Sequence, residues 1–282
     1  MTRDEQLQWE ARWARPAAIA AVVAGLLMLA SAMVFFPKDR EGIERSPDLL
    51  LSIDQNSGGY MASAVLSSVA ALLLAGVFYY LFRAIMARGG GVPEWFLYLV
   101  IGAPLVYAVA TLGGAVQAID LAEEFVDDGI IRGEKGSDHA KDLGGASPAL
   151  VALATAGTVG LAFLFVMLPL RARRVGLLTP FMAILGAIAG ALVVFQLAGV
   201  SAVLQAFWLC ALAALFAGRW PGGRGPAWAS GEAEPWPSAA ERRGEVPPRQ
   251  PAPELDPTAP IPEPEPVPER PASRKRRKKR KR

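Results

Sequence analysis

Five stretches of this chain contain no Asp, Glu, Lys, Arg or His, and they constrain its fold more than any other feature. They are residues 16–37, 55–82, 95–119, 143–170 and 175–218. A helix crosses a bilayer with about 20 apolar residues, so each stretch is long enough for one crossing. The last stretch has 44 residues, too many for one helix, and the segment QLAGVSA (Gln196 to Ala202) near its middle suits a tight turn. The sequence therefore predicts an all-α fold, a six-helix transmembrane bundle.

The transmembrane domain is expected over residues 17–218, with helix cores at 17–36, 61–82, 95–119, 149–170, 177–199 and 202–217. Pro16 and Pro180 suit the first turn of a helix, and Pro37 and Pro169 lie at or near predicted ends. Pro104 is internal to the third core and predicts a kink there.

The first core has a second interpretation, as a signal peptide. The sequence LMLASAM (Leu27 to Met33) contains a small-residue pattern that signal peptidase recognises, with Ala32 as the cleavage residue. A 16-residue leader of mixed charge and the apolar continuation MVFF favour an uncleaved anchor instead. Cleavage at Ala32 stays an alternative.

Lysine and arginine are unevenly divided between the connecting segments. With the amino terminus in the cytoplasm, the inside segments contain 23 of the 29 Lys and Arg residues and the outside loops contain six. The connection RARR (Arg171 to Arg174) is basic and has no acid. Because positive charge concentrates on the cytoplasmic side, we predict a multi-pass protein of the cell membrane with both termini cytoplasmic. Residues 1–16 form a cytoplasmic juxtamembrane segment in this prediction.

Aromatic residues agree with this topology. Tyr79, Tyr80 and Trp95 flank the second predicted cytoplasmic loop, and Trp220 follows the last core. Tyrosine and tryptophan are enriched at membrane–water interfaces, so these residues are expected in an interfacial belt.

The chain beyond residue 218 consists of two blocks of different composition. Residues 219–269 contain 14 of the 23 prolines together with nine acidic residues. Such a composition favours extended polyproline geometry and cannot bury a core, so we expect a disordered proline-rich acidic arm over 219–273. The tip is polybasic, and its nine residues are the expected polyanion contact: Arg274, Lys275, Arg276, Arg277, Lys278, Lys279, Arg280, Lys281 and Arg282.

The expected partner of this tip is the anionic lipid headgroup layer of the bilayer. A tether holds the tip near the membrane surface at high effective concentration, whereas DNA or RNA competes from solution. Nucleic acid is therefore the secondary candidate, although basic runs of this kind also bind it. Folding of the tip onto the acids of the arm, or simple solvation, remains an alternative. Protein partners cannot be derived from the sequence.

The second predicted outer loop, residues 120–145, contains the single histidine. Asp138, His139 and Asp142 offer oxygen and nitrogen ligands, but their spacing matches no metal motif. No metal and no other cofactor is expected. The start of the loop, DLAEEFVDD, is expected to extend the third helix as far as Gly129.

Within the spans the large polar residues are glutamines. Gln117, Gln196 and Gln205 are interpreted as interhelical hydrogen-bond formers. The single cysteine, Cys210, excludes an intramolecular disulfide and is interpreted as a small buried hydrophobe. No ionisable residue lies in a core, so the groups that acid–base or nucleophilic catalysis needs are missing there.

The fifth core contains AILGAIAGALV, in which Gly186 and Gly190 lie four residues apart. A pair of this kind lets two helices approach closely, and packing within the bundle is the favoured interpretation over a dimer interface. A basic turn joins the fourth and fifth cores in the segment RARRVGLLTPFMAILGAIAG. With this turn, the arrangement of residues 10 to 218 resembles small multi-pass bacterial membrane proteins of unknown function. The resemblance implies a fold and a membrane location only.

Two functional hypotheses lead, and a membrane enzyme ranks third because the catalytic groups are missing from the spans. The first is a non-enzymatic anchor or accessory protein whose basic tail contacts anionic lipid or another polyanion. The second is a transporter or channel for a neutral or lipophilic solute, which needs no buried charge. A water-filled cavity lined by the three glutamines would favour transport, and a solid bundle would favour the anchor.

Overall fold

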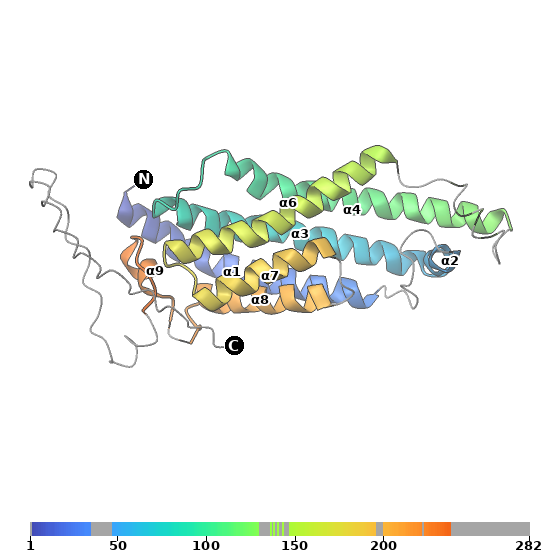
Figure 1. The fold of residues 1–282 in the computed structure, drawn as a ribbon. Helices are drawn as coiled ribbons and strands as arrows, with labels where there is room; N and C mark the ends of the chain where they lie inside the picture. The colour runs from blue at the N-terminus through green and yellow to red at the C-terminus, as the bar shows by residue number, and fades with distance from the viewer. Residues whose placement is uncertain are drawn as a thin grey trace, which may run out of the picture. The chain divides into compact units, whose positions relative to one another are not determined.

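The computed structural model describes residues 2–34, 47–129, 136, 138, 140, 143, 147–195, 200–221 and 223–237. Within these residues the regular secondary structure is helical (Figure 1), which confirms the all-α prediction for this part of the chain. The helices are α1 (Arg3–Val34), α2 (Pro47–Gln55), α3 (Ser57–Ala87), α4 (Phe96–Asp127), α6 (Pro148–Arg174), α7 (Pro180–Phe195), α8 (Val200–Phe216) and α9 (Pro226–Ser230).

Four helices, α1, α3, α4 and α6, are long and apolar enough to cross a membrane. They contain the first four predicted cores almost completely. Trp95 precedes α4, and residues 35–36 of the first core lie outside the described part. The fifth and sixth cores correspond to α7 and α8, with 16 and 17 residues. At about 1.5 Å per residue these two reach about 25 Å, less than the ~30 Å of a hydrocarbon core. Length and composition therefore support four crossing helices.

The first helix begins fourteen residues earlier than its predicted core. Thr2 and Glu5 form a capping box, in which Thr2 Oγ1 accepts from the Glu5 amide at 3.3 Å and Glu5 Oε2 accepts from the Thr2 amide at 2.7 Å. The prediction that Pro16 starts the helix is wrong, because Pro16 lies inside α1. Proline gives no N–H to the carbonyl of residue 12 and its ring crowds that carbonyl, yet the helix continues through it.

One further boundary, the end of α6, differs from the sequence prediction, and two others agree with it. The RARR segment is the last turn of α6 rather than a loop, where its arginines face the negative end of the helix dipole. Pro169 accordingly lies inside α6, while Pro180 is the first residue of α7, as expected. The extension of the third helix is confirmed, because α4 continues to Asp127 and Gly129 follows with φ of 71°.

Helices α1, α3, α4, α6, α7 and α8 form a closed ring of neighbours. Helix α1 packs against α3 and α8, and the ring continues from α3 through α4, α6 and α7 back to α8; α3 and α6 also meet each other. Phe78 of α3 packs edge-on against Phe165 of α6 with ring centroids 5.1 Å apart, and Phe165 packs against Trp208 of α8 at 5.4 Å. All three side chains are fully buried. Large aromatic side chains therefore fill this part of the bundle.

Glycines allow α7 to approach its neighbours closely. A Cβ added to Gly186 would lie 2.7 Å from Pro169 Cγ and 2.8 Å from Trp208 Nε1. A Cβ added to Gly190 would lie 2.8 Å from the Ala162 carbonyl oxygen on α6. The GxxxG pair therefore packs within the bundle, as the sequence suggested.

The outer surface of the bundle is apolar. In each of the four long helices the 18-residue apolar window is only 28–39% buried, so most of its residues are at least partly exposed. Large exposed side chains occur on every helix of the ring, among them Ile19, Leu26, Val69, Leu72, Leu105, Val109, Val159, Phe163, Ile184, Ile188, Val203 and Phe207. Cys210 is also exposed, so its interpretation as a buried hydrophobe is wrong. Sequence hydropathy alone does not separate the two faces of a uniformly apolar helix.

Candidate functional site

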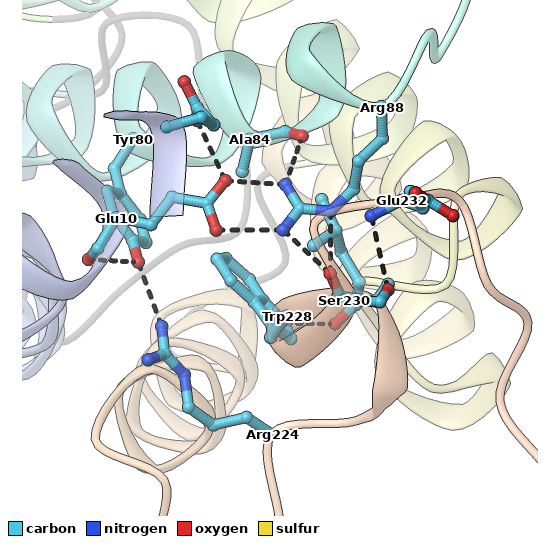
Figure 2. Close-up of polar contacts among 11 residues, drawn as sticks. Glu10, Tyr80, Ala84, Arg88, Arg224, Trp228, Ser230 and Glu232 are labelled. Atoms are coloured by element: carbon cyan, nitrogen blue, oxygen red, sulfur yellow. Dashed lines mark hydrogen bonds and ion pairs between the residues drawn. The ribbon is translucent and has the colours of Figure 1, made fainter. Parts of the chain in front are cut away.

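A charged pair lies buried at the end of the bundle where α1 begins and α3 ends. Glu10 of α1 and Arg88, the residue that follows α3, form a two-point pair (Figure 2), with Oε1 to Nη1 at 2.6 Å and Oε2 to Nη2 at 2.9 Å. The exposed fraction of the side chain is 0% for Arg88 and 3% for Glu10. Each charge thus meets its opposite away from water, which a buried ion requires.

Every N–H of the Arg88 guanidinium has an acceptor. Beyond the two bonds to Glu10, Nη1 donates to the Ala84 carbonyl at 2.8 Å, and Nε and Nη2 both donate to the Ala227 carbonyl at 3.0 and 2.9 Å. Glu10 Oε1 also accepts from Gln6 Nε2, one helical turn earlier, at 2.9 Å. A guanidinium has five N–H groups in one plane, and here the plane joins α1, α3 and the chain beyond α8.

The chain beyond α8 reaches this pair through the short helix α9. Gly225, with φ of 80°, precedes the helix and Gly231, with φ of 74°, follows it. The Trp228 side chain is 5% exposed, and its indole N–H donates to the Leu177 carbonyl at 2.9 Å. The Glu234 amide donates to the Val175 carbonyl at 3.3 Å. The predicted start of the disordered arm at residue 219 is therefore corrected, because residues 223–237 contain a buried tryptophan and a helix.

Aromatic rings line the place where Trp228 lies. Tyr80 is stacked between Trp228 and Trp9, with centroids 5.8 and 5.6 Å away and interplanar angles of 12° and 25°. Phe216 packs edge-on against Trp228 at 5.9 Å. The Tyr80 hydroxyl donates to the Glu10 backbone carbonyl at 3.1 Å and accepts from Arg224 Nη2 at 3.1 Å. Polar and aromatic contacts are thus joined in one cluster, which Figure 2 shows around Glu10.

Two cations lie over the same indole. The guanidinium carbon of Arg88 is 5.4 Å from the centre of the Trp228 ring, and that of Arg224 is 4.9 Å away. Cation–π attraction is strongest for tryptophan. The interfacial-belt prediction is wrong for Tyr80, which is 2% exposed inside this cluster, whereas Trp95 is 60% exposed at the surface.

Sequence reasoning missed this pair because Glu10 and Arg88 lie 78 residues apart and outside the charge-free stretches. One signal was present in the sequence. The buried face of α1 continues at helical spacing through Gln6, Glu10, Ala14, Ala17 and Ala21. A charged residue in register with the core-facing stripe of a helix is expected to point toward the core as well.

The residues singled out by sequence lie apart from this cluster. The Gln117 side-chain oxygen accepts from the Ser147 amide at 3.1 Å, which confirms an interhelical role for Gln117, between α4 and the start of α6. Gln205 is buried on α8, which packs against α1 and α7. Gln196 lies outside the described residues, as do His139 and Asp142 of the metal hypothesis. Among the described residues no group of three potential His, Cys, Asp or Glu ligands occurs.

The polybasic tip, Arg274 to Arg282, also lies outside the described residues. No family model matches the chain, and no similar protein was found among curated proteins or among solved structures. The features of the chain that bear on function are therefore the bundle and the cluster at its arginine-containing end. Because Glu10 and Arg88 neutralise each other, what this cluster offers chemically is a means of holding a peptide segment.

Proposed function

We propose that the protein is a non-enzymatic, multi-pass anchor of the cell membrane that presents a cytoplasmic arm to anionic partners. The observation that carries the proposal is the outward-facing apolar surface of the bundle. Four helices bury only 28–39% of their most apolar windows against one another. The remaining apolar side chains need a non-aqueous surrounding, which the hydrocarbon core of a bilayer supplies.

The proposal includes six membrane-embedded helices, with α7 and α8 as a shorter hairpin. Helix α7 packs on α6 and α8 packs on α1, so both belong to the ring that the four longer helices form. A helix shorter than the hydrocarbon core is accommodated by local thinning of the bilayer or by burial among longer helices.

The cytoplasmic assignment of one bundle end follows from charge. The start of α1, the end of α3, the connection from α6 to α7 and α9 meet around the Glu10–Arg88 pair. These segments belong to the set that contains 23 of the 29 Lys and Arg residues. By the positive-inside rule, this concentration of positive charge supports a cytoplasmic location for this end and for the arm that follows it in the chain.

The arm's tip is the proposed contact with the membrane surface. Each basic residue near an anionic leaflet gains about 1 kcal/mol, an upper value that salt reduces. The tip contains nine consecutive basic residues, Arg274 to Arg282. Anionic lipid headgroups are the first candidate partner, and nucleic acid is the second. The aromatic filling between α3, α6 and α8 supports an anchor over a solute pathway.

A vesicle-binding experiment tests the role of the tip. A peptide of residues 238–282 should bind vesicles of anionic phosphatidylglycerol, should not bind neutral phosphatidylcholine vesicles, and should bind less as salt rises. The matched peptide 238–273, which lacks the tip, should not bind. Equal binding of both peptides, or preference of the longer one for RNA at physiological salt, would contradict the proposal.

A further inference from the structure

Segment 224–236, here called the latch, contacts the bundle through a specific set of groups. Four residues of the bundle end, Tyr80, Arg88, Leu177 and Phe216, are here called the tryptophan slot because each contacts Trp228 or the carbonyl before it. We propose that the tryptophan slot is a peptide-docking site, and that the latch is its resident and displaceable ligand.

The slot is organised by contacts that do not involve the latch. Two bonds from Glu10 and one from the Ala84 carbonyl fix the guanidinium plane of Arg88. The remaining N–H groups, on Nε and Nη2, point to the position of the Ala227 carbonyl. The Tyr80 hydroxyl is held by the Glu10 carbonyl. A receptor whose groups are already in place loses little conformational entropy when a peptide binds.

The contacts select a small residue followed by tryptophan. Ala227 is 0% exposed, so a larger side chain has no room there, and its carbonyl accepts two N–H groups of Arg88. The next residue, Trp228, stacks on Tyr80 and donates its indole N–H to the Leu177 carbonyl. A hydrogen-bonded carbonyl between the two residues, followed by a stacked ring whose own N–H is bonded, resembles the anchor of a protein–peptide interface.

The latch also has features that favour its dissociation from the slot. Its helix has only five residues, and Gly223, Gly225 and Gly231 supply positive φ values around it. Within the described residues, the buried Nε of Arg224 and the buried Nε1 of Trp236 have no hydrogen-bond acceptor. Burying a donor without an acceptor costs free energy that undocking recovers. The bonds from Glu10 and Ala84 to Arg88, and from Tyr80 to Glu10, thus do not depend on the latch, while the latch is imperfectly satisfied in the slot.

A cleavage-and-retention experiment tests this inference in the full-length protein. Residues 221–223 are replaced by a specific protease site, and the protein is held in nanodiscs through an amino-terminal tag. After cleavage, fragment 224–282 should stay with the bundle. An added peptide of residues 223–237 should displace it, whereas the same peptide with Trp228→Ala should not.

Two neighbouring alanines supply a matched pair of variants. Ala227→Leu should release the cleaved fragment about tenfold faster or more, whereas Ala229→Leu, at an exposed position, should leave its retention unchanged. Trp228→Ala should also release the fragment, and the emptied bundle should then bind the wild-type peptide 223–237, which shows that the slot itself is intact. Loss of the wild-type fragment on cleavage, its retention by Trp228→Ala, or failure of the peptide to bind the emptied bundle would overturn the inference.

Discussion

A guanidinium that is removed from water needs an acceptor for each of its five N–H groups and an opposite charge nearby. Arg88 has both, because Glu10 supplies two oxygens and the carbonyls of Ala84 and Ala227 supply the rest. Glu10 and Arg88 must therefore both be present for this end of the bundle to pack as it does, since either charge alone would be buried without a counter-ion. The effect of a substitution at either residue on stability depends on the charged partner that remains.

Arg88→Met tests this dependence. It leaves the Glu10 carboxylate buried without a counter-ion, and we expect the free energy of unfolding to fall by about 3–5 kcal/mol. Arg173→Met, at an exposed arginine of the same bundle end, should change it by less than about 0.5 kcal/mol. Adding Glu10→Met to Arg88→Met should restore part of the loss, measured by denaturant unfolding in detergent micelles. Additive losses in the double variant would contradict the pairing.

At the scale of elements, the close approach of neighbouring helices determines how α7 packs against α6 and α8. Both glycines of its GxxxG pair face neighbouring helices at distances that leave no room for a methyl group. Interhelical contact of this kind stabilises membrane helices through van der Waals packing, because lipid provides no hydrophobic drive between them.

Gly190→Ala should therefore separate α7 from α6. The added Cβ would lie 2.8 Å from the Ala162 carbonyl oxygen and 2.9 Å from Phe165 Cβ, and overpacking of this kind costs about 1–3 kcal/mol. Gly102→Ala is the matched control, because its Cβ would meet nothing within 4 Å. We expect the control to be neutral or slightly stabilising, since alanine favours helix by up to ~1 kcal/mol over glycine. Equal thermal unfolding midpoints for the two variants would show that the approach is not tight.

At the scale of the whole molecule, the direction of the helices and the distribution of charged residues are consistent with each other. The helices alternate so that the arginine-containing segments meet at one end of the bundle, around Glu10 and Arg88. Helix α2 lies at the other end, where Leu50 and Ile53 pack with Phe125 near the end of α4. The described parts of that end contain Asp48, Asp54, Glu123, Glu124 and Asp127. The two ends thus differ in charge, and the arginine-containing end is the one that the proposed topology assigns to the cytoplasm.

Cysteine labelling in intact cells tests the orientation. In a Cys210→Ala background, a cysteine at Ser137 should react with a membrane-impermeant maleimide, because the second outer loop is predicted to face outward. A cysteine at Ser273, in the arm, should react only after the cells are opened. The reverse pattern would place the arm outside, and with it the polybasic tip.

The sequence by itself determined the properties that each segment has independently of the others. Transfer of about 20 apolar residues into a bilayer depends on that window alone, so the four long apolar helices were predictable from charge-free stretches. The extension of α4 to Gly129 and the packing role of the GxxxG pair were also predictable, because both follow from local residue types.

The tertiary structure decided which distant residues meet. Glu10, Arg88 and Ala227 are brought together across 78 and 139 residues, and nothing in their local sequences favours that pairing. The latch shows the same limit, because a proline-rich composition predicts no core of its own, yet Trp228 is buried in the core of the bundle. Composition describes what a segment can bury within itself, whereas docking depends on a complementary surface elsewhere in the chain.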